Sequence, residues 1–170
     1  MPTLTPDRKV QLRRELELIL GAVESSPSGP IEVWYASDGE LIRLNNGRLA
    51  GNTGLSPEWQ SVTLPQFPTW SALATQGQPF RWERGRDVMP GYRYGVHDKL
   101  VLSVIPAPAS SGLIGIDPKQ LVWFEERTEA PTEEPLPPSR YAVQGDRVVY
   151  GEQCVSRESC FKWQRWPAGA

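Results

Sequence analysis

The residues best suited to chemistry are His97, the single histidine of the chain, and Asp98 beside it. A carboxylate next to an imidazole can position it as a general base. Nucleophilic catalysis also needs a serine or cysteine that a sharp turn exposes, and the sequence contains no Gly-x-Ser-x-Gly elbow to provide one. We therefore interpret His97 as a turn residue between strands, and we predict that the protein is not an enzyme.

Paired carboxylates could hydrolyse a glycosidic bond if a rigid frame held them on either side of a sugar. The acidic residues gather instead in a proline-rich stretch, residues 125–138. Such a stretch can hardly pack, so we expect a solvated loop in which neither burial nor a fixed frame tunes a pKa. The carboxylates in question are Glu125, Glu126, Glu129, Glu133 and Glu134.

The remaining cofactor chemistries lack their motifs. One histidine and two cysteines do not supply the paired spacing of a zinc site. Neither a Walker lysine motif nor a dinucleotide fingerprint occurs. The net charge of −2, from 18 basic and 20 acidic residues, is too small to gather nucleic acid. We predict no catalytic residue, no metal, no cofactor and no nucleic-acid partner.

Cys154 and Cys160 flank a short polar stretch inside an expected C-terminal hairpin, where facing residues can reach disulfide distance. A disulfide would favour an oxidising compartment and free thiols the cytosol, and both alternatives stay open here. The start of the chain carries no secretory signal, and no run of about 18 apolar residues could span a bilayer. We expect either a cytosolic protein or a mature chain whose export segment was removed.

Seven tryptophans offer flat rings that could stack on sugars. Most should pack in a core, and the charged neighbours of Trp82 and Trp163 place those two rings inside by strand alternation. Trp59 and Trp70 lie in less regular segments and are expected to be exposed. Together with Arg48 they are the candidate contacts for a glycan or a protein partner.

The N-terminal segment has the pattern of a helix. Thr5 can cap it, Pro6 suits its first position, and an apolar face recurs at helical spacing. That face consists of Leu12, Leu16, Ile19, Leu20 and Val23. A Ser-, Pro- and Gly-rich linker follows, so we predict a helix and linker over residues 1–30 and a single β domain over residues 31–170.

From Ile31 onward the pattern has a period of two. Asp38-Gly39 and Asn46-Gly47 tolerate the positive φ of tight hairpin turns, and alternating apolar residues flank both pairs. This predicts a three-stranded antiparallel meander over residues 32–50. The sequence as a whole predicts an all-β, mainly antiparallel fold, a curved sheet or open barrel with one N-terminal helix.

Weaker patterns cover the rest of the chain. Strands are expected at residues 60–64, 80–83, 92–97, 100–105, 119–124, 141–143, 147–150 and 160–166, and a helical turn at 69–75. The segment Arg84-Gly85-Arg86 is expected to be a turn, and Asp98-Lys99 is expected to break the strand pattern around it.

The block from Glu40 to Leu49, followed by Gly54-Leu55, resembles the YjbF/GfcB family, the group 4 capsule polysaccharide lipoproteins. Members carry a strand, an Asn-Gly-Arg turn, a second strand and a Gly-Leu pair at this spacing. An aromatic-basic strand like residues 80–83 and a C-terminal pair of strands like residues 141–150 add to the similarity.

This resemblance implies a periplasmic or outer-membrane protein that assists capsule or exopolysaccharide export without catalysis, with other envelope export proteins and the polysaccharide as its partners. It carries over no catalytic residues. The chain lacks the lipobox cysteine of the family near its start, so membrane association would rest on an anchor absent from this sequence. The alternative function is a stand-alone carbohydrate-binding module that uses exposed tryptophans.

Overall fold

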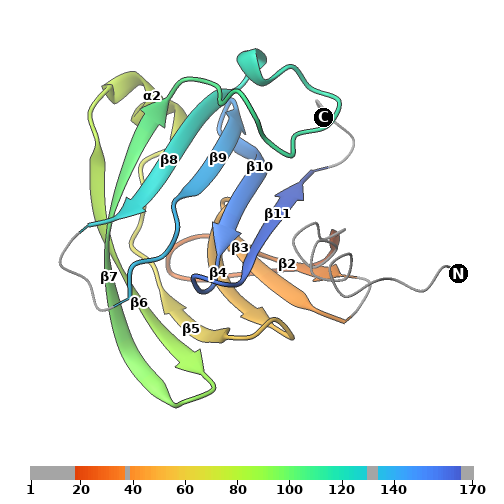
Figure 1. Cartoon of the computed structure of the whole chain (residues 1–170), viewed down its shortest axis with the longest axis vertical. Coiled ribbons are helices and arrows are strands. Elements are labelled where there is room, and N and C mark those ends of the chain that lie inside the picture. The colour runs from red at the N-terminus through yellow and green to blue at the C-terminus, as the bar shows by residue number, and fades with distance from the viewer. Residues whose placement is uncertain (1–17, 37–38, 130–133, 166–170) are drawn as a thin grey trace, which may run out of the picture.

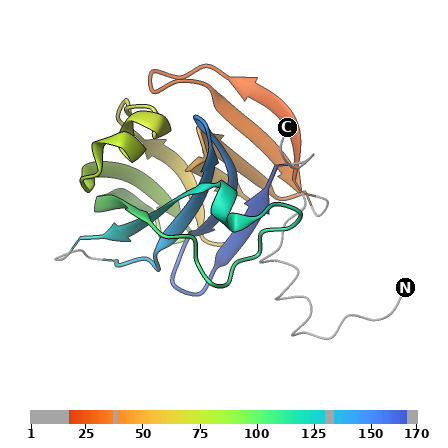
Figure 2. The same ribbon diagram turned by 90° about the horizontal axis from the view of Figure 1, so that it is seen from above.

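The computed structural model of the chain describes residues 18–36, 39–129 and 134–165. Two antiparallel sheets curve around a shared interior and form an open barrel (Figures 1 and 2). One sheet contains, in order, β1 (Leu18–Glu24), β2 (Ile31–Ala36), β3 (Leu41–Asn45) and β4 (Arg48–Thr53). The predicted all-β class is confirmed.

The other sheet follows the chain from one edge to the other, each strand pairing with the next. Its strands are β5 (Glu58–Thr63), β6 (Phe80–Met89), β7 (Arg93–Ile105), β8 (Val122–Thr128), β9 (Ser139–Gln144), β10 (Arg147–Cys154) and β11 (Cys160–Gln164). A short 3-10 helix, Pro118–Gln120, precedes β8. The connections differ in length, from the turn at 145–146 between β9 and β10 to the segments 64–79 and 106–121 before β6 and β8.

The core between the sheets draws buried apolar side chains from both of them. Ile42 and Leu44 come from β3, while Leu102 and Phe124 come from β7 and β8. Trp82 and Trp163 are also buried, as their charged neighbours predicted. Each sheet therefore covers the apolar face of the other.

The predicted N-terminal helix is wrong over residues 18–24, which form β1 and pair with β2. The pairing register shifts between Leu20 and Ala22, and the intervening Gly21 lies against the Tyr35 ring, where a Cβ would come within 2.1 Å of a ring carbon. Neighbouring strand edges thus override a local helical pattern. The earlier part of that prediction, with Thr5, lies outside the described residues.

The predicted meander is confirmed as β2, β3 and β4. Asn46 and Gly47 at the β3–β4 turn have φ values of 45° and 86°, the left-handed conformation that such a hairpin requires. A Cβ on Gly47 would lie 2.4 Å from the Val148 side chain of β10. The glycine therefore also lets this turn approach the opposite sheet closely.

Two predicted interruptions of the central strands are wrong. Arg84-Gly85-Arg86 lies inside β6, and Asp98-Lys99 lies inside β7. Gly85 pairs with His97 and Arg84 with Asp98 across one continuous ladder. Charged residues that resembled a turn in the sequence can occupy a strand because β6 and β7 bring opposite charges together.

The strand expected at residues 119–124 also differs, because β8 begins later and continues to Thr128. Four residues of the expected acidic loop, 125–128, are therefore strand. Among the described residues there is one α-helix, α2 (Trp70–Gln76), where the sequence predicted a helical turn. Thr69 caps it and Gly77 ends it. Within the described part of the chain, no helix is long and apolar enough to cross a membrane.

Candidate functional site

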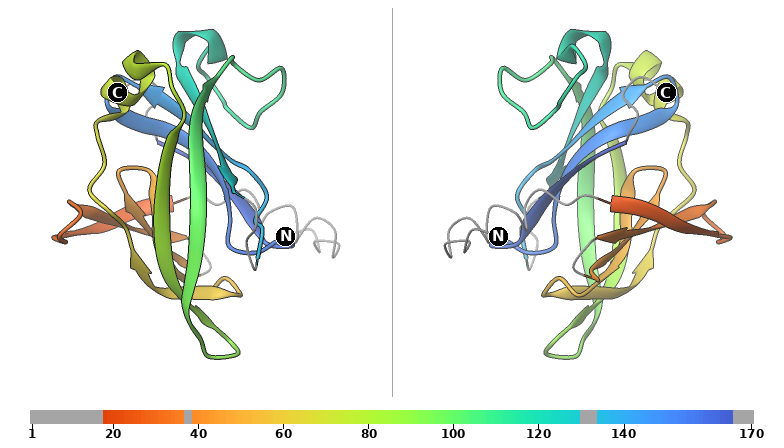
Figure 3. Two further views of the ribbon diagram at one scale, coloured as in Figure 1. Left: turned by 90° about the vertical axis from the view of Figure 1, so that its left-hand side faces the viewer. Right: turned by 90° about the vertical axis from the view of Figure 1, so that its right-hand side faces the viewer.

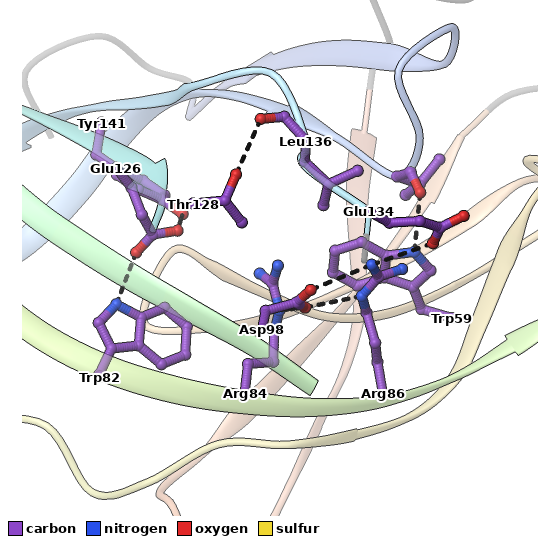
Figure 4. A network of polar contacts seen from close by, with 11 residues as sticks. Trp59, Trp82, Arg84, Arg86, Asp98, Glu126, Thr128, Glu134, Leu136 and Tyr141 are labelled. Carbon is purple, nitrogen blue, oxygen red and sulfur yellow. Dashed lines mark hydrogen bonds and ion pairs between the residues drawn. The ribbon is translucent and has the colours of Figure 1, made fainter. Parts of the chain in front are cut away.

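Two arginines and one aspartate form an ion cluster inside the barrel (Figure 4). Alternation along β6 turns Arg84 and Arg86 to the inner face, and Asp98 of β7 lies opposite them. The Nε atoms of Arg84 and Arg86 donate to Asp98 Oδ2 at 2.9 and 2.8 Å, and Arg86 Nη2 donates to Oδ1 at 3.2 Å. All three residues are buried, so the cluster is shielded from solvent.

Electrostatics within this cluster favour the charged forms. Burial alone raises the pKa of Asp98, but the hydrogen bonds and positive charges of Arg86 and Arg84 outweigh it and lower the pKa. The Trp59 ring adds a cation–π contact, with its centroid 4.6 Å from the Arg84 guanidinium carbon and 4.7 Å from that of Arg86.

A second network of buried hydrogen bonds begins at Glu126 on β8. Its carboxylate accepts from Trp82 Nε1 at 2.9 Å and from the Tyr141 hydroxyl at 3.3 Å. The hydroxyl in turn accepts from Gln153 Nε2, which also donates to the Gly47 carbonyl at 2.8 Å. Desolvation raises the pKa of Glu126 despite these donors and the neighbouring arginines. The prediction that no carboxylate of this stretch is buried or held in a rigid frame is wrong for Glu126.

Arg48 is buried without a hydrogen-bond partner for any of its three side-chain nitrogens among the described residues. Its guanidinium lies between two rings, 3.6 Å from the Phe67 centroid and 4.1 Å from the Trp70 centroid. Burial lowers the pKa of Arg48 to about 10, so the side chain stays positively charged at neutral pH. The two ring faces and the nearby Glu126 compensate part of its lost hydration.

A cavity of about 20 Å³ lies beside the two polar networks and is lined by Arg84, Glu126 and Tyr141 among others. Leu136 and Pro137 form part of its wall, and the Leu136 carbonyl accepts from Thr128 Oγ1 at 3.3 Å. A volume of that size holds a single water molecule. This cavity is therefore too small for a sugar ring.

At the rim of the cluster, Glu134 bridges the buried and the exposed parts of the site. Its carboxylate forms one ion pair with Arg93 and another with Arg86, whose Nη2 is 3.5 Å from Glu134 Oε2. The Glu134 and Arg93 side chains are 40% and 41% exposed, whereas that of Arg86 is 1% exposed. Through Glu134 and Arg93, the series of ion pairs that begins in the buried cluster extends to the exposed surface.

A wider groove of about 650 Å³ lies on the outer surface along the first half of β6. It is bordered by residues 63–66, Phe80 and His97. His97 lies on the exposed face of β7 with Nε2 3.4 Å from Glu83 Oε1, while Asp98 points to the interior. Alternation along one strand thus separates the adjacent His97 and Asp98, and they do not form a dyad.

The residues predicted to contact a glycan or partner are placed together, but not on the surface. Trp59, Trp70 and Arg48 are all buried, so the expected exposure of the two tryptophans is wrong. Helix α2 carries the Trp70 ring inward against Arg48 and to 5.0 Å from the Phe124 ring. Trp59 is held by its Nε1 donating to the Val155 carbonyl at 3.0 Å.

The two cysteines are paired directly across β10 and β11, and a disulfide bond joins Cys154 to Cys160. Of the two alternatives that the sequence left open, the structure contains the bonded one. Among the described residues no group of histidine, cysteine and acidic side chains could hold a metal ion.

The fold and its site can now be compared with known proteins. The family model described as "Group 4 capsule polysaccharide lipoprotein gfcB, YjbF" matches residues 9–156, so the chain belongs to a lipoprotein family of the cell envelope. That family is YjbF, and the resemblance in the sequence is confirmed.

A solved structure agrees with this fold. The crystal structure of the hypothetical lipoprotein YmcC from Escherichia coli (K12) matches with a TM-score of 0.54 and 14% identity, over 88% of this chain and 80% of that one. At this level of identity the likeness shows the fold alone. No curated protein matches the chain.

Sequence reasoning missed most of the interior cluster, namely Arg84, Arg86, Asp98 and Glu126. One signal was available: Trp82, Arg84, Arg86 and Val88 alternate with exposed or half-exposed residues. Because Trp82 was expected inside, the same parity assigns both arginines to the inner face. The signal was lost when Arg84-Gly85-Arg86 was interpreted as a turn.

Proposed function

We propose that this protein is a non-enzymatic accessory of capsule or exopolysaccharide export, located in the periplasm or at the outer membrane. The observation that carries the proposal is the family match over residues 9–156. The Cys154–Cys160 disulfide supports it, because such bonds persist in oxidising compartments. Its partners in this proposal are envelope proteins of the export machinery and the polysaccharide itself.

The character of the interior supports a non-catalytic role. A catalytic acid or base must reach its substrate, but Asp98 and Glu126 are buried and bonded to protein groups. Their paired charges can be explained by the need to neutralise each other inside a barrel. The exposed titratable pair His97 and Glu83 lies on an open strand face beside the outer groove.

The alternative function, a module that binds carbohydrate through exposed tryptophans, loses its structural basis. Trp59 and Trp70, the two candidates, are buried. Any contact with polysaccharide would have to use other side chains.

A gene deletion tests the proposal. We expect cells without the protein to release or display less capsular or exported polysaccharide, measured as uronic acid and total sugar at the cell surface. A plasmid copy should restore the amount. Unchanged polysaccharide in the deletion strain, together with a cytosolic location of the protein on fractionation, would contradict the proposal.

A further inference from the structure

The rim of the interior cluster contains two arginines that converge on a single carboxylate. Arg86 comes from β6 and Arg93 from the start of β7, and both form ion pairs with Glu134. The two arginines flank the far end of a long hairpin that projects beyond the rest of the barrel (Figure 3). Two arginines around one carboxylate make a strong anion site.

The charges of the buried cluster explain why an anion belongs at this position. Asp98 carries one negative charge between the positive charges of Arg84 and Arg86. Among these three residues one positive charge is in excess. Arg84 also interacts with the buried Glu126, and Glu134 pairs with Arg86 at the rim. An uncompensated buried charge is costly, so some anion should occupy this position at all times.

Glu134 is well placed to exchange with an anion from outside. Its side chain is 40% exposed, and it comes from the connection between β8 and β9 rather than from a strand of the barrel. Rotation of this one side chain would remove the ion-pair partner of Arg93 and the outer partner of Arg86, while Arg86 stays bonded to Asp98. The barrel itself would not need to open.

We propose that Arg86 and Arg93 form a carboxylate-binding site for an acidic saccharide, and that Glu134 occupies this site as an internal substitute when no saccharide is bound. The inference rests on the proposed function, which supplies the polysaccharide, and it specifies the chemical class of that ligand. A uronic acid residue carries the required carboxylate on a sugar ring.

Two exposed tyrosines that neighbour Arg93 in the sequence favour a saccharide over another carboxylate. Tyr92 and Tyr94 flank Arg93 in the sequence and are 71% and 67% exposed, the largest exposed fractions among the described tyrosines. Flat rings beside a cation can stack on sugar faces while the cation binds the carboxylate. A glutamate-rich peptide would use the arginines but would gain little from the two rings.

The test is a calorimetric titration of the full chain with a galacturonic acid tetrasaccharide. Glu134→Gln removes the competing charge, so we expect affinity to rise about fivefold, the effect of about 1 kcal/mol from one exposed ion pair. Arg93→Gln should weaken binding at least about tenfold, the loss of one charged hydrogen-bonding group. The double variant Tyr92→Ala, Tyr94→Ala should weaken it by a similar factor.

Matched controls are available on neighbouring strands. Glu129→Gln removes a carboxylate that is 37% exposed and paired with Arg81, and Arg127→Gln removes an exposed arginine paired with Glu125. Both variants should bind the tetrasaccharide like the original chain. A neutral galactose tetrasaccharide should not bind, and tetraglutamate should bind without any effect of the tyrosine variants.

The inference is overturned if Glu134→Gln binds no more tightly than Glu129→Gln, if Arg93→Gln retains full affinity, or if the neutral sugar binds equally well. The saccharide assignment would be overturned if the chain bound tetraglutamate as tightly as the tetrasaccharide and the double tyrosine variant kept its full affinity for the tetrasaccharide. Failure of the proposed function can be distinguished from failure of the proposed binding site. If an Arg93→Gln copy restores polysaccharide to the deletion strain, the proposed site is wrong and the proposed function stands. If the deletion has no phenotype while the chain binds the acidic sugar, the proposed function is wrong and the binding site stands.

Discussion

Arg48 and the pair of Arg84 and Arg86 are buried in the same barrel but are accommodated in different ways. The pair shares the carboxylate of Asp98 through three hydrogen bonds. Arg48 has no hydrogen bond among the described residues and instead lies between the rings of Phe67 and Trp70. One site compensates buried charge with a hydrogen-bonded opposite charge, and the other with aromatic faces and the nearby Glu126, to which Arg48 is not hydrogen-bonded.

The difference predicts how strongly a substitution at each site should destabilise the protein. Removing one member of a buried ion cluster leaves uncompensated charge, which is strongly destabilising. An arginine held by ring faces has no partner that would be left behind with unmet hydrogen bonds. The Asp98 cluster should therefore be sensitive to substitution, and the Arg48 site should be tolerant.

The largest effect is expected for Asp98→Asn. This change keeps the shape of the side chain but leaves Arg84 and Arg86 without a counter-charge, and should lower the free energy of unfolding by about 3 to 5 kcal/mol. Urea denaturation measures the loss, with the exposed Glu158→Gln as a control expected to change it by less than about 0.5 kcal/mol. A loss as small as that of the control would show that the cluster is not needed for stability.

The same carboxylate should make stability depend on pH in acid. The folded-state pKa of Asp98 lies below its ordinary value of 3.8, so its contribution is fully present above that value and is lost as pH falls through the folded pKa. Asp98→Asn should remove this part of the acid dependence.

Glu126→Gln should change the free energy of unfolding by an intermediate amount. The contribution of Glu126 depends on pH in the opposite sense to that of Asp98. The pKa of Glu126 is raised above its ordinary value of 4.5 by desolvation, so the folded state loses stability as pH rises from that value through the folded pKa. The variant should abolish this decline and be more stable than the original chain by about 1 kcal/mol at pH 8. Thermal unfolding from pH 4 to pH 8 measures it, and parallel curves for the two proteins would contradict it.

The smallest effect is expected for Arg48→Met. Methionine can fill the space between Phe67 and Trp70 without a charge to desolvate, so the lost cation–π attraction and the relieved burial should cancel to within about 1 kcal/mol. The same change at Arg86 should cost about 3 kcal/mol, because it leaves Asp98 partly unpaired. Equal losses at the two positions, compared in urea, would remove the distinction between the two environments.

The two sheets also differ in how well the sequence predicted them. In the four-stranded sheet, Asn46-Gly47 located a hairpin because only a few residue types tolerate its dihedral angles. In the seven-stranded sheet, Arg84-Gly85-Arg86 and Asp98-Lys99 have the pattern of breaks, because charged residues and glycine usually interrupt strands. Their burial depends on partners 12 or 14 positions away, which no local pattern contains.

The candidate site was predicted less well than the fold. Arg48, Trp59 and Trp70 were chosen as surface contacts, and they lie in the core around the interior charges. The irregular sequence context of Trp59 and Trp70 suggests exposure, yet both rings are buried and pack against arginines. Glu134 belonged to a stretch interpreted as a solvated loop, and its pairing with Arg86 and Arg93 required the hairpin and the β8–β9 connection to meet in space.

The amino-acid sequence by itself determined the β class, the meander, the helical turn of α2 and the family. These depend on local dihedral preferences, alternation and a short characteristic block. Only the tertiary structure decided which charges lie inside the barrel and what neutralises them. The physical reason is that a buried charge is tolerated only with compensating groups. Strand pairing and the packing of the connections determine which groups are within reach.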